Sequence, residues 1–472
     1  MLPKIFNTTN NNYQGSWVAD LRINSILSDN SLSFLSVPCN RSEILQRQEL
    51  FGKIIKKDGS DIIQSCLSML KSLDRTRELL NNAHNELERL HYRIEQYEIY
   101  IDTVKSFTAL NDYGILLSQI AVYFNNQMDT VSEMLDATKH SLKKLQPLMS
   151  GLISLQDKIW VTPDHNVTDD YELIKNLVIT MGLEAPKRKR YMLTVENSLS
   201  DAICSMYKDN LEDIRQNLDK FEHINCFEVL EYIPELEFIS EIVSLVKRAS
   251  GYGIEYCFPK VADEPSYFGE GVADITLMTN GTDSIVVNDV DFREDSFNFL
   301  VGANSGGKTT YLRAVAVNLI LFLSGCPIFA KNAEIFPFDF VGTHFTSDER
   351  YNDTGRLDDE LNRTEKMIKS ANKRCAFLFF NETFSGTDDK RGFELLKSTV
   401  RELKRNNHFG LWVTHFSDVL TLGEPILTVK VGENNCRTYR VERLNNVYSS
   451  YANDILRKYG IDGESLRKRR KS

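Results

Sequence analysis

Hydrophobic residues between Pro38 and Pro147 recur every seven positions, and no proline interrupts the span. The first series is Cys66, Leu73, Leu80, Leu87, Ile94 and Ile101, and a second series three positions later is Met69, Thr76, Ala83, Leu90, Tyr97 and Val104. This repeat predicts one helical stripe of about 39 residues, which is about 60 Å at 1.5 Å per residue. Such a stripe must pack against another helix, either in an ordinary bundle core or as a long lever.

In the second half of the chain the pattern changes to short β-rich runs that alternate with helical segments. Examples are Ser284–Val287 and Phe297–Val301, which are rich in β-branched or aromatic residues. Two glycines and two prolines interrupt the helical pattern just before this change. We therefore predict an α plus α/β fold, with a helical domain at residues 1–250 and an α/β domain at residues 251–472.

A glycine-rich segment fits the phosphate-binding pattern G-x-x-x-x-G-K-[ST]. Its residues are Gly302, Ala303, Asn304, Ser305, Gly306, Gly307, Lys308 and Thr309, followed by Thr310. The segment lies between a predicted buried strand and a predicted helix at Thr310–Leu323, so its backbone N–H groups and the helix N-terminus can hold an anion. Lys308 would reach the β- and γ-phosphates of a nucleoside triphosphate, and the Thr309 hydroxyl would bind Mg²⁺. The alternative is a glycine-rich surface turn without a ligand.

Two later apolar runs end in polar residues, at Cys375–Glu382 and at Gly410–His415. Runs of this kind predict buried central strands. In nucleotide hydrolases the carboxyl end of such a strand meets the metal and the attacking water, so Glu382 is a candidate general base. His415 follows the next strand and is a candidate to sense the γ-phosphate. Both side chains can instead be structural, Glu382 at a helix start and His415 as a satisfied polar group.

Composition adds little to this picture. Charged residues make up 26% and hydrophobic residues 42%, which is ordinary for a globular protein. The net charge of −10 does not indicate a nucleic-acid binder, but Lys187–Arg190 and Arg467–Lys471 are dense enough to meet a phosphate backbone unless they are merely solvated. Eight cysteines show no metal-ligand spacing and are expected to be reduced. Without a signal peptide or a membrane-spanning stretch, we expect a cytoplasmic protein.

Together these motifs resemble those of the MutS family of DNA mismatch-repair ATPases, members of the ABC-type ATPase group. The glycine-rich loop is similar to the family pattern G-P-N-x-G-G-K-S-T, including Asn304 at its third position. Asn381–Thr387 resembles D-E-x-x-x-G-T, and Thr414–Phe416 resembles the T-H-Y/F step. Further short similarities are found at Asp20–Leu21, Ile44–Gln48, Val287–Asp289, Arg391–Gly392, Ser449–Ala452 and Gly460–Ile461.

The resemblance implies a P-loop ABC-type ATPase domain with ATP and Mg²⁺ as its ligands. It assigns the phosphates to Lys308 and the loop amides, and the metal to Thr309 and Asn381. It assigns the attacking water to Glu382 and the surroundings of the γ-phosphate to His415. It also implies a homodimer with a C-terminal dimerisation segment, whose nucleotide state is carried by long helices to a clamp around DNA.

This chain departs from the family pattern at three places. Asn381 stands where the family has Asp, so one negative charge is missing beside the metal. Gly355–Glu360 stands where the family has a Ser-Thr-Phe segment that contacts nucleotide across the dimer, and no role is assigned to it. The chain begins almost at once with the helical core, so we expect no N-terminal Phe-x-Glu domain that reads mismatches.

Three functions follow as hypotheses. The leading one is an ATP-dependent DNA-binding protein that acts on mismatched, branched or otherwise unusual DNA in repair or recombination. The second is a MutS-like ATPase switch that grips a protein or ribonucleoprotein partner. The third is a weakly hydrolysing member that works through dimerisation, as Asn381 suggests.

Overall fold

The computed structural model describes residues 2–6, 17–156, 200–282, 284–293, 297–302, 306–346, 356–431 and 437–444. The chain divides into two compact units, one formed by Met1–Asn7 with Lys53–Ser240 and the other by Thr8–Gly52 with Glu241–Ser472. The two boundaries fall inside helices, in α3 (Arg41–Lys56) and in α11 (Ile233–Gly251). Helical and sheet structure are both present, as the sequence predicts.

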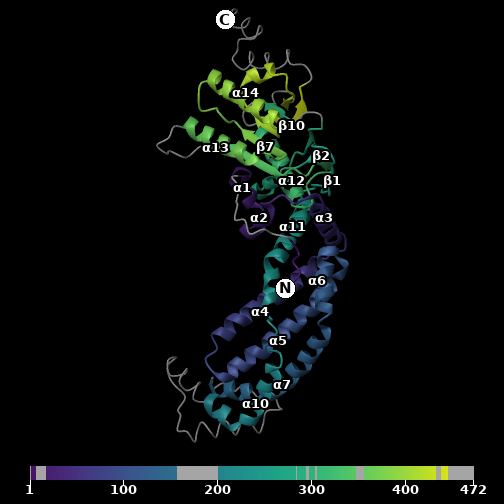
Figure 1. Cartoon of the computed structure of the whole chain (residues 1–472), viewed down its shortest axis with the longest axis vertical. Helices are drawn as coiled ribbons and strands as arrows, with labels where there is room; N and C mark the ends of the chain where they lie inside the picture. The colour runs from purple at the N-terminus through teal and green to yellow at the C-terminus, as the bar shows by residue number, and fades with distance from the viewer. Residues whose placement is uncertain are drawn as a thin grey trace, which may run out of the picture. The chain divides into compact units, whose positions relative to one another are not determined.

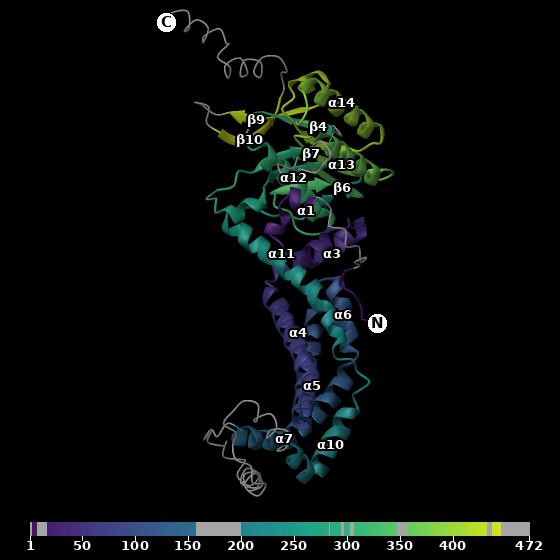
Figure 2. The ribbon, with the colours of Figure 1, turned by 90° about the vertical axis from the view of Figure 1, so that its left-hand side faces the viewer.

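The described part of the first unit is helical (Figure 1). Besides the first half of α11, its elements are α4 (Ser60–Asn81), α5 (Glu86–Thr108), η2 (Ala109–Asp112), α6 (Ile115–Asn125), α7 (Met128–Gln156), α10 (Lys208–Asp219) and η3 (Glu228–Tyr232). Helix α5 packs against α4, α6 and α7, and α7 also packs against α10 (Figure 2). The unit is therefore built around α5.

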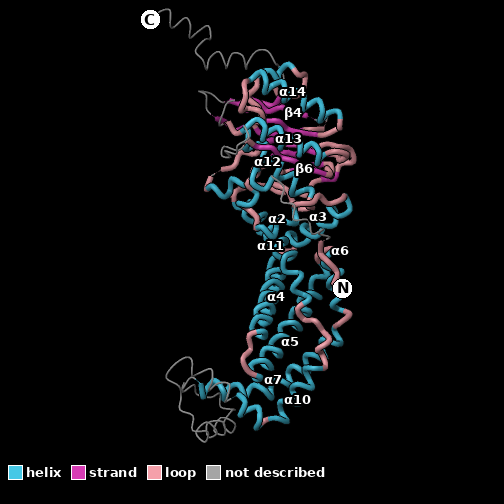
Figure 3. Tube along the Cα trace, turned by 60° about the vertical axis from the view of Figure 1, so that its left-hand side comes forward, coloured by secondary structure: helices cyan, strands magenta, loops and turns pink. Residues whose placement is uncertain are grey.

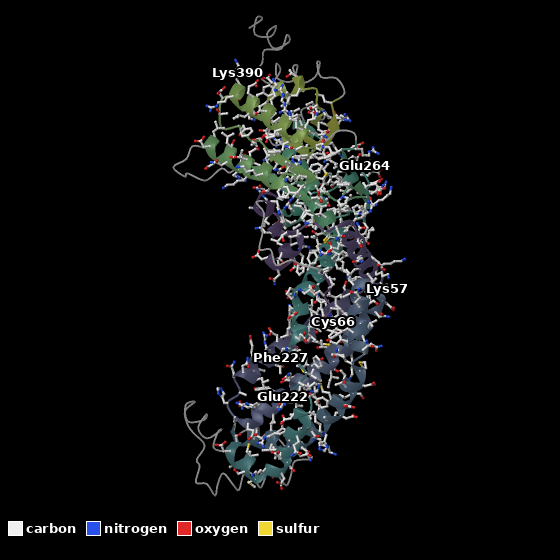
Figure 4. The ribbon with its side chains drawn as sticks, viewed as in Figure 1. Lys57, Cys66, Glu222, Phe227, Glu264 and Lys390 are labelled. Atoms are coloured by element: carbon white, nitrogen blue, oxygen red, sulfur yellow. The ribbon has the colours of Figure 1, made fainter. Side chains whose placement is uncertain are left out.

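The prediction of one continuous helical stripe is wrong, because the stripe is divided between α4 and α5. The interruption has a local cause: the Asn85 side chain accepts a hydrogen bond from the Glu88 amide, and the Glu88 carboxylate accepts one from the His84 amide, both at 2.9 Å. With Asn85 as its N-cap, a new helix starts at Glu86. Most of the heptad residues are buried, among them Cys66, which is labelled in Figure 4. They lie on two consecutive helices, α4 and α5, that pack on each other.

The second unit contains two mixed sheets (Figure 3). The four-stranded sheet has the order β1-β5-β2-β3, and the six-stranded sheet has the order β10-β9-β4-β8-β7-β6. The strands are β1 (Lys260–Val261), β2 (Tyr267–Val272), β3 (Asn288–Asp291), β4 (Phe297–Val301), β5 (Asn332–Ile335), β6 (Phe340–Phe345), β7 (Ala376–Asn381), β8 (Phe409–Val413), β9 (Ile426–Val431) and β10 (Arg437–Arg443). The helices are α1 (Trp17–Asp20), η1 (Ile23–Ser25), α2 (Asp29–Leu35), η4 (Ile275–Asn280), α12 (Lys308–Leu323), α13 (Arg356–Ala371), α14 (Asp389–Arg405) and η5 (Ser417–Thr421), together with most of α3 and the end of α11.

The central strands β4, β7 and β8 of the larger sheet are buried on both faces, which explains their continuous apolar runs. Every residue of β4 is buried, and alternate side chains such as Phe297 and Phe299 join one core with the apolar residues of α13 and α14. Phe380 and Trp412 stack in this core with ring centroids 4.0 Å apart. Helix α12 packs against β7 and β8. Strand β4 and helix α12 lie where the sequence predicts them, whereas Ser284–Val287 is not a strand and β3 begins only at Asn288.

The segment Thr8–Gly52 belongs to the second unit, although we expected all of residues 1–250 to form one helical domain. Polar contacts over long sequence distances hold it there. The Cys39 amide donates to the Leu323 carbonyl at 2.7 Å, and the Thr343 hydroxyl donates to the Asp20 carboxylate at 2.7 Å. A pattern of local helical periodicity carries no information about such contacts.

The seven described cysteines are all free, and burial raises the pKa of the Cys66 thiol to about 12. No helix in the described ranges is long and apolar enough to cross a bilayer.

Candidate functional site

The candidate residues follow three neighbouring parallel strands. β4 pairs with β8 and β8 pairs with β7, all in parallel, so the segments that follow them leave the sheet at the same edge. Backbone hydrogen bonds continue beyond the strands: the Thr414 amide donates to the Leu300 carbonyl at 3.1 Å, and the Glu382 amide donates to the Val413 carbonyl at 2.8 Å. The topology therefore brings together the glycine-rich loop, the Asn-Glu pair and the Thr-His pair.

The glycine-rich loop connects β4 to α12, as its motif requires. Gly302 has φ 138° and Gly307 has φ 100°, conformations that favour glycine. Lys308 begins α12, is only 4% exposed, and donates from Nζ to the Gly302 carbonyl at 2.8 Å. Amides in the first turn of a helix point out of its N-terminus, where they can bind an anion. Ala303, Asn304 and Ser305 lie outside the described residues, so their predicted contacts stay predictions.

Thr309 and Asn381 meet at the end of the sheet. The Thr309 hydroxyl donates to Asn381 Oδ1 at 3.2 Å, which joins the start of α12 to the end of β7. A hydroxyl and an amide oxygen suit Mg²⁺, which usually takes few protein ligands and completes its shell with phosphates and water. The donor set thus fits the predicted metal, although no cluster of three or more His, Cys, Asp or Glu side chains occurs among the described residues.

Glu382 directly follows β7 and is half-buried. Its backbone is left-handed, with φ 53°, and Phe384 two residues later has φ 67°. The Ser385 amide closes the turn by donating to the Glu382 carbonyl at 3.2 Å. Non-glycine residues rarely adopt this conformation, and functional sites are where it concentrates.

His415 follows β8 and its side chain is 40% exposed. Its Nε2 lies 3.8 Å from the Asp389 carboxylate, which is itself 87% exposed, and its ring lies 4.5 Å from that of Phe416. The contact with Asp389 is long and solvated, so it holds the ring only weakly. His415 is thus accessible to a ligand at this edge of the sheet.

Several residues near these strand ends were given no role by the sequence analysis. Tyr439 contacts the loop, since a Cβ added to Gly307 would lie 3.1 Å from its ring. Asn288 holds this part of β10, because its side chain donates to the Tyr439 carbonyl at 3.1 Å and accepts from the Val441 amide at 2.7 Å. Glu360 and His344, both buried, bind the turn after Glu382. The sequence alone does not show that these residues contact the motifs, because folding brings them together.

A parallel sheet whose strand ends gather a glycine-rich loop, a Lys-Thr step and an Asn-Glu pair is typical of phosphate-binding α/β domains. A sequence model of MutS domain V matches residues 298–468. The chain is 23% identical over 461 residues to the DNA mismatch repair protein MutS of Clostridium kluyveri, covering 90% of this chain and 51% of that protein. It is 25% identical over 337 residues to MSH3 of Candida glabrata, covering 68% and 31% of the two chains. It is 30% identical over 151 residues to msh-2 of Neurospora crassa, covering 31% and 16%.

Residues 298–468 therefore match MutS domain V, and the chain as a whole is similar to DNA mismatch repair proteins of the MutS and MSH type. The match to domain V includes β4, the glycine-rich loop, β7 and β8, and therefore every candidate site residue. The matched regions cover about half the length or less of these relatives.

Proposed function

We propose that this protein is an ATPase of the MutS family that switches a dimeric DNA-binding clamp. The observation that carries the ATPase part is the contact of Thr309 with Asn381 beside the buried Lys308. It unites the predicted metal ligands from two separate motifs next to the predicted phosphate-binding lysine. A glycine-rich surface turn without a ligand would not require this arrangement.

In this proposal each residue acts at a definite position. Lys308 exchanges its bond to the Gly302 carbonyl for phosphate oxygens, and the first amides of α12 bind the same anion. Thr309 and Asn381 would hold Mg²⁺, which would neutralise charge on the phosphates. Glu382 orients the attacking water and accepts its proton. His415 lies at the γ-phosphate, where its accessible ring can donate a hydrogen bond.

The DNA-binding part rests on the resemblance to MutS proteins. The relatives named above are DNA mismatch repair proteins. We propose that this chain forms a homodimer and binds mismatched, branched or otherwise unusual DNA in repair or recombination. ATP binding would favour one conformational state of the dimer, and hydrolysis would allow the dimer to leave that state.

A second candidate is a weakly hydrolysing member that works through nucleotide-dependent dimerisation. Asn381 favours it, because this side chain brings a neutral amide to the metal position where the family pattern has a carboxylate. A protein or ribonucleoprotein partner in place of DNA is the remaining alternative.

The test is ATP hydrolysis by the purified chain with duplex, mismatched and branched DNA, and without DNA. We expect turnover that rises with one form of DNA. Lys308→Ala should lower turnover by about 100-fold or more, because it removes a charge that stabilises the transition state. The matched control is Lys373→Ala, at an exposed position outside the site.

The outcomes separate the candidates. Lys308-dependent turnover that ignores every DNA form would favour a protein or ribonucleoprotein partner. Glu382→Gln removes the proposed base. If nucleotide-dependent dimers still form to the same extent in this variant, the result would favour the weakly hydrolysing member. Failure to bind ATP would contradict the ATPase proposal itself.

A further inference from the structure

The turn that presents Glu382 has a backbone that needs support from outside. Both Glu382 and Phe384 have positive φ values, 53° and 67°, and neither is glycine. A turn of this kind persists when surrounding groups over-determine it. Its own closing bond, from the Ser385 amide to the Glu382 carbonyl, is 3.2 Å long. The position of the Glu382 carboxylate therefore depends on what holds the rest of the turn.

The first anchor is Glu360 on α13. Its Oε2 accepts a hydrogen bond from the Phe384 amide at 2.7 Å, and Glu360 as a whole is only 5% exposed. Carboxylate acceptors make short and strong bonds to backbone amides, the more so where water is excluded. The Thr364 hydroxyl donates to the Glu360 carbonyl at 2.8 Å one helical turn later. Glu360 thus fixes the Phe384 end of the turn to α13.

The second anchor is His344 at the end of β6. Its Nδ1 lies 2.9 Å from the hydroxyl of Thr383. Thr383 is fully buried and stands between Glu382 and Phe384, the two residues with left-handed backbone. The same hydroxyl donates to the His344 carbonyl at 3.4 Å. A hydroxyl has one proton to donate, so the network assigns the proton of the imidazole to Nδ1, which donates to Thr383. Burial, followed by the charge of Arg363, lowers the pKa of His344 to about 3, so the ring is neutral near pH 7.

We infer that Glu360 and His344 are positioning residues that hold the Glu382 turn in its working conformation. The inference rests on the proposed function, in which Glu382 orients the water. Both residues are buried and act through the turn, Glu360 on the Phe384 amide and His344 on the Thr383 hydroxyl. The two anchors come from different elements, β6 and α13, and neither belongs to the glycine-rich loop.

The experiment measures kcat and KM for ATP, and affinity for a fluorescent ATP analogue, on the full chain. Glu360→Ala should lower kcat by about 10- to 100-fold, because a misplacement of about 1 Å costs this much at a catalytic group. KM and nucleotide affinity should stay within about twofold, because the phosphate-binding groups lie on another element. Glu360→Gln keeps an acceptor oxygen for the Phe384 amide and should recover most of kcat. The matched control is Glu365→Ala, on the same helix with a side chain that is 61% exposed.

Two outcomes would overturn the inference. One is an unchanged kcat in Glu360→Ala; the other is a loss of nucleotide affinity as large as the loss of kcat, which would indicate general damage. Thr383→Val removes the hydroxyl that the second anchor holds, at nearly constant volume, and should also lower kcat. It serves as the independent variant if circular dichroism shows that Glu360→Ala does not fold.

A chain without Lys308-dependent turnover would contradict the proposed function and not this inference. Hydrogen exchange then tests the anchors directly. Glu360→Ala should speed exchange of the Phe384 and Ser385 amides relative to the Glu365→Ala control. Unchanged exchange at both amides would overturn the anchoring role.

Discussion

At the scale of single residues, Asn381 separates this chain most clearly from the family pattern. Its amide oxygen occupies the expected position, since it accepts from the Thr309 hydroxyl at 3.2 Å. An amide oxygen can bind Mg²⁺ but brings no negative charge to it. The geometry of a metal ligand is therefore present while its charge is missing. This predicts that the metal is bound weakly, with the protein fold unaffected.

Asn381→Asp should accordingly lower the Mg²⁺ concentration that gives half-maximal ATP turnover by about tenfold or more. The physical reason is that an added unit charge about 4 Å from a cation contributes on the order of a few kcal/mol near a protein surface. A titration of turnover against Mg²⁺ measures the effect. Asn372→Asp makes the same charge change at an exposed position and should leave the titration unchanged. Identical titrations for Asn381→Asp and the unaltered chain would show that this position does not face the metal.

At the scale of elements, α14 is fitted closely to the turn after β7. Gly392 lies in its first turns, and a Cβ added there would lie 2.7 Å from the Phe384 carbonyl oxygen and 2.6 Å from the Phe416 ring. The carbonyl belongs to the same turn that carries Glu382, so it cannot retreat without moving that residue. The family pattern also has a glycine at this position. The physical reason is that the backbones of α14 and the turn approach each other closely here.

Gly392→Ala should therefore destabilise the protein by about 1–3 kcal/mol through overpacking. The sign is informative, because Ala in place of Gly inside a helix ordinarily stabilises by roughly 0.5–1 kcal/mol. Thermal unfolding followed by circular dichroism measures it. Gly251→Ala, in α11 with nothing within 4 Å of the added Cβ, is the control and should leave the melting temperature unchanged or slightly higher. A melting temperature raised by Gly392→Ala would show that α14 is packed more loosely than described.

At the scale of the whole molecule, we propose different roles for the two compact units, ATP hydrolysis for the second and DNA binding for the first. The described candidate site lies entirely in the second unit. The basic cluster Lys187–Arg190 lies outside the described residues, within the sequence range of the first unit. A chain with a net charge of −10 needs local positive charge to hold a phosphate backbone.

Replacing Lys187, Arg188, Lys189 and Arg190 by Gln should weaken DNA binding and make it less dependent on salt. Each lost phosphate contact reduces the slope of log affinity against log salt by about 0.9 on duplex DNA. Fluorescence anisotropy at several salt concentrations measures the slope. The control replaces Arg467, Lys468, Arg469 and Arg470, the same number of charges in the basic tail, and should change the slope less. Equal slopes for the first variant and the unaltered chain would remove this cluster from the DNA-binding surface.

Features that depend on short stretches of chain could be predicted from the residues alone. Apolar runs placed β4, β7 and β8, and the glycine pattern placed the loop before α12, because burial on both faces and left-handed turns leave direct marks in the residues. The resemblance to MutS proteins followed from the same motifs, and the match to MutS domain V confirms it for residues 298–468. One prediction from periodicity was wrong. The heptad stripe predicted one helix, but the capping of α5 by Asn85 divides the stripe into two helices.

Contacts between distant side chains became known only from the folded chain. Folding brought Thr309 to Asn381 and placed Glu360 and His344 under the Glu382 turn. It also put Thr8–Gly52 into the same unit as the candidate site. These contacts join residues about twenty to several hundred positions apart, and each depends on strand order and helix packing. No local pattern encodes them, because a buried glutamate or histidine looks the same in sequence as an exposed one.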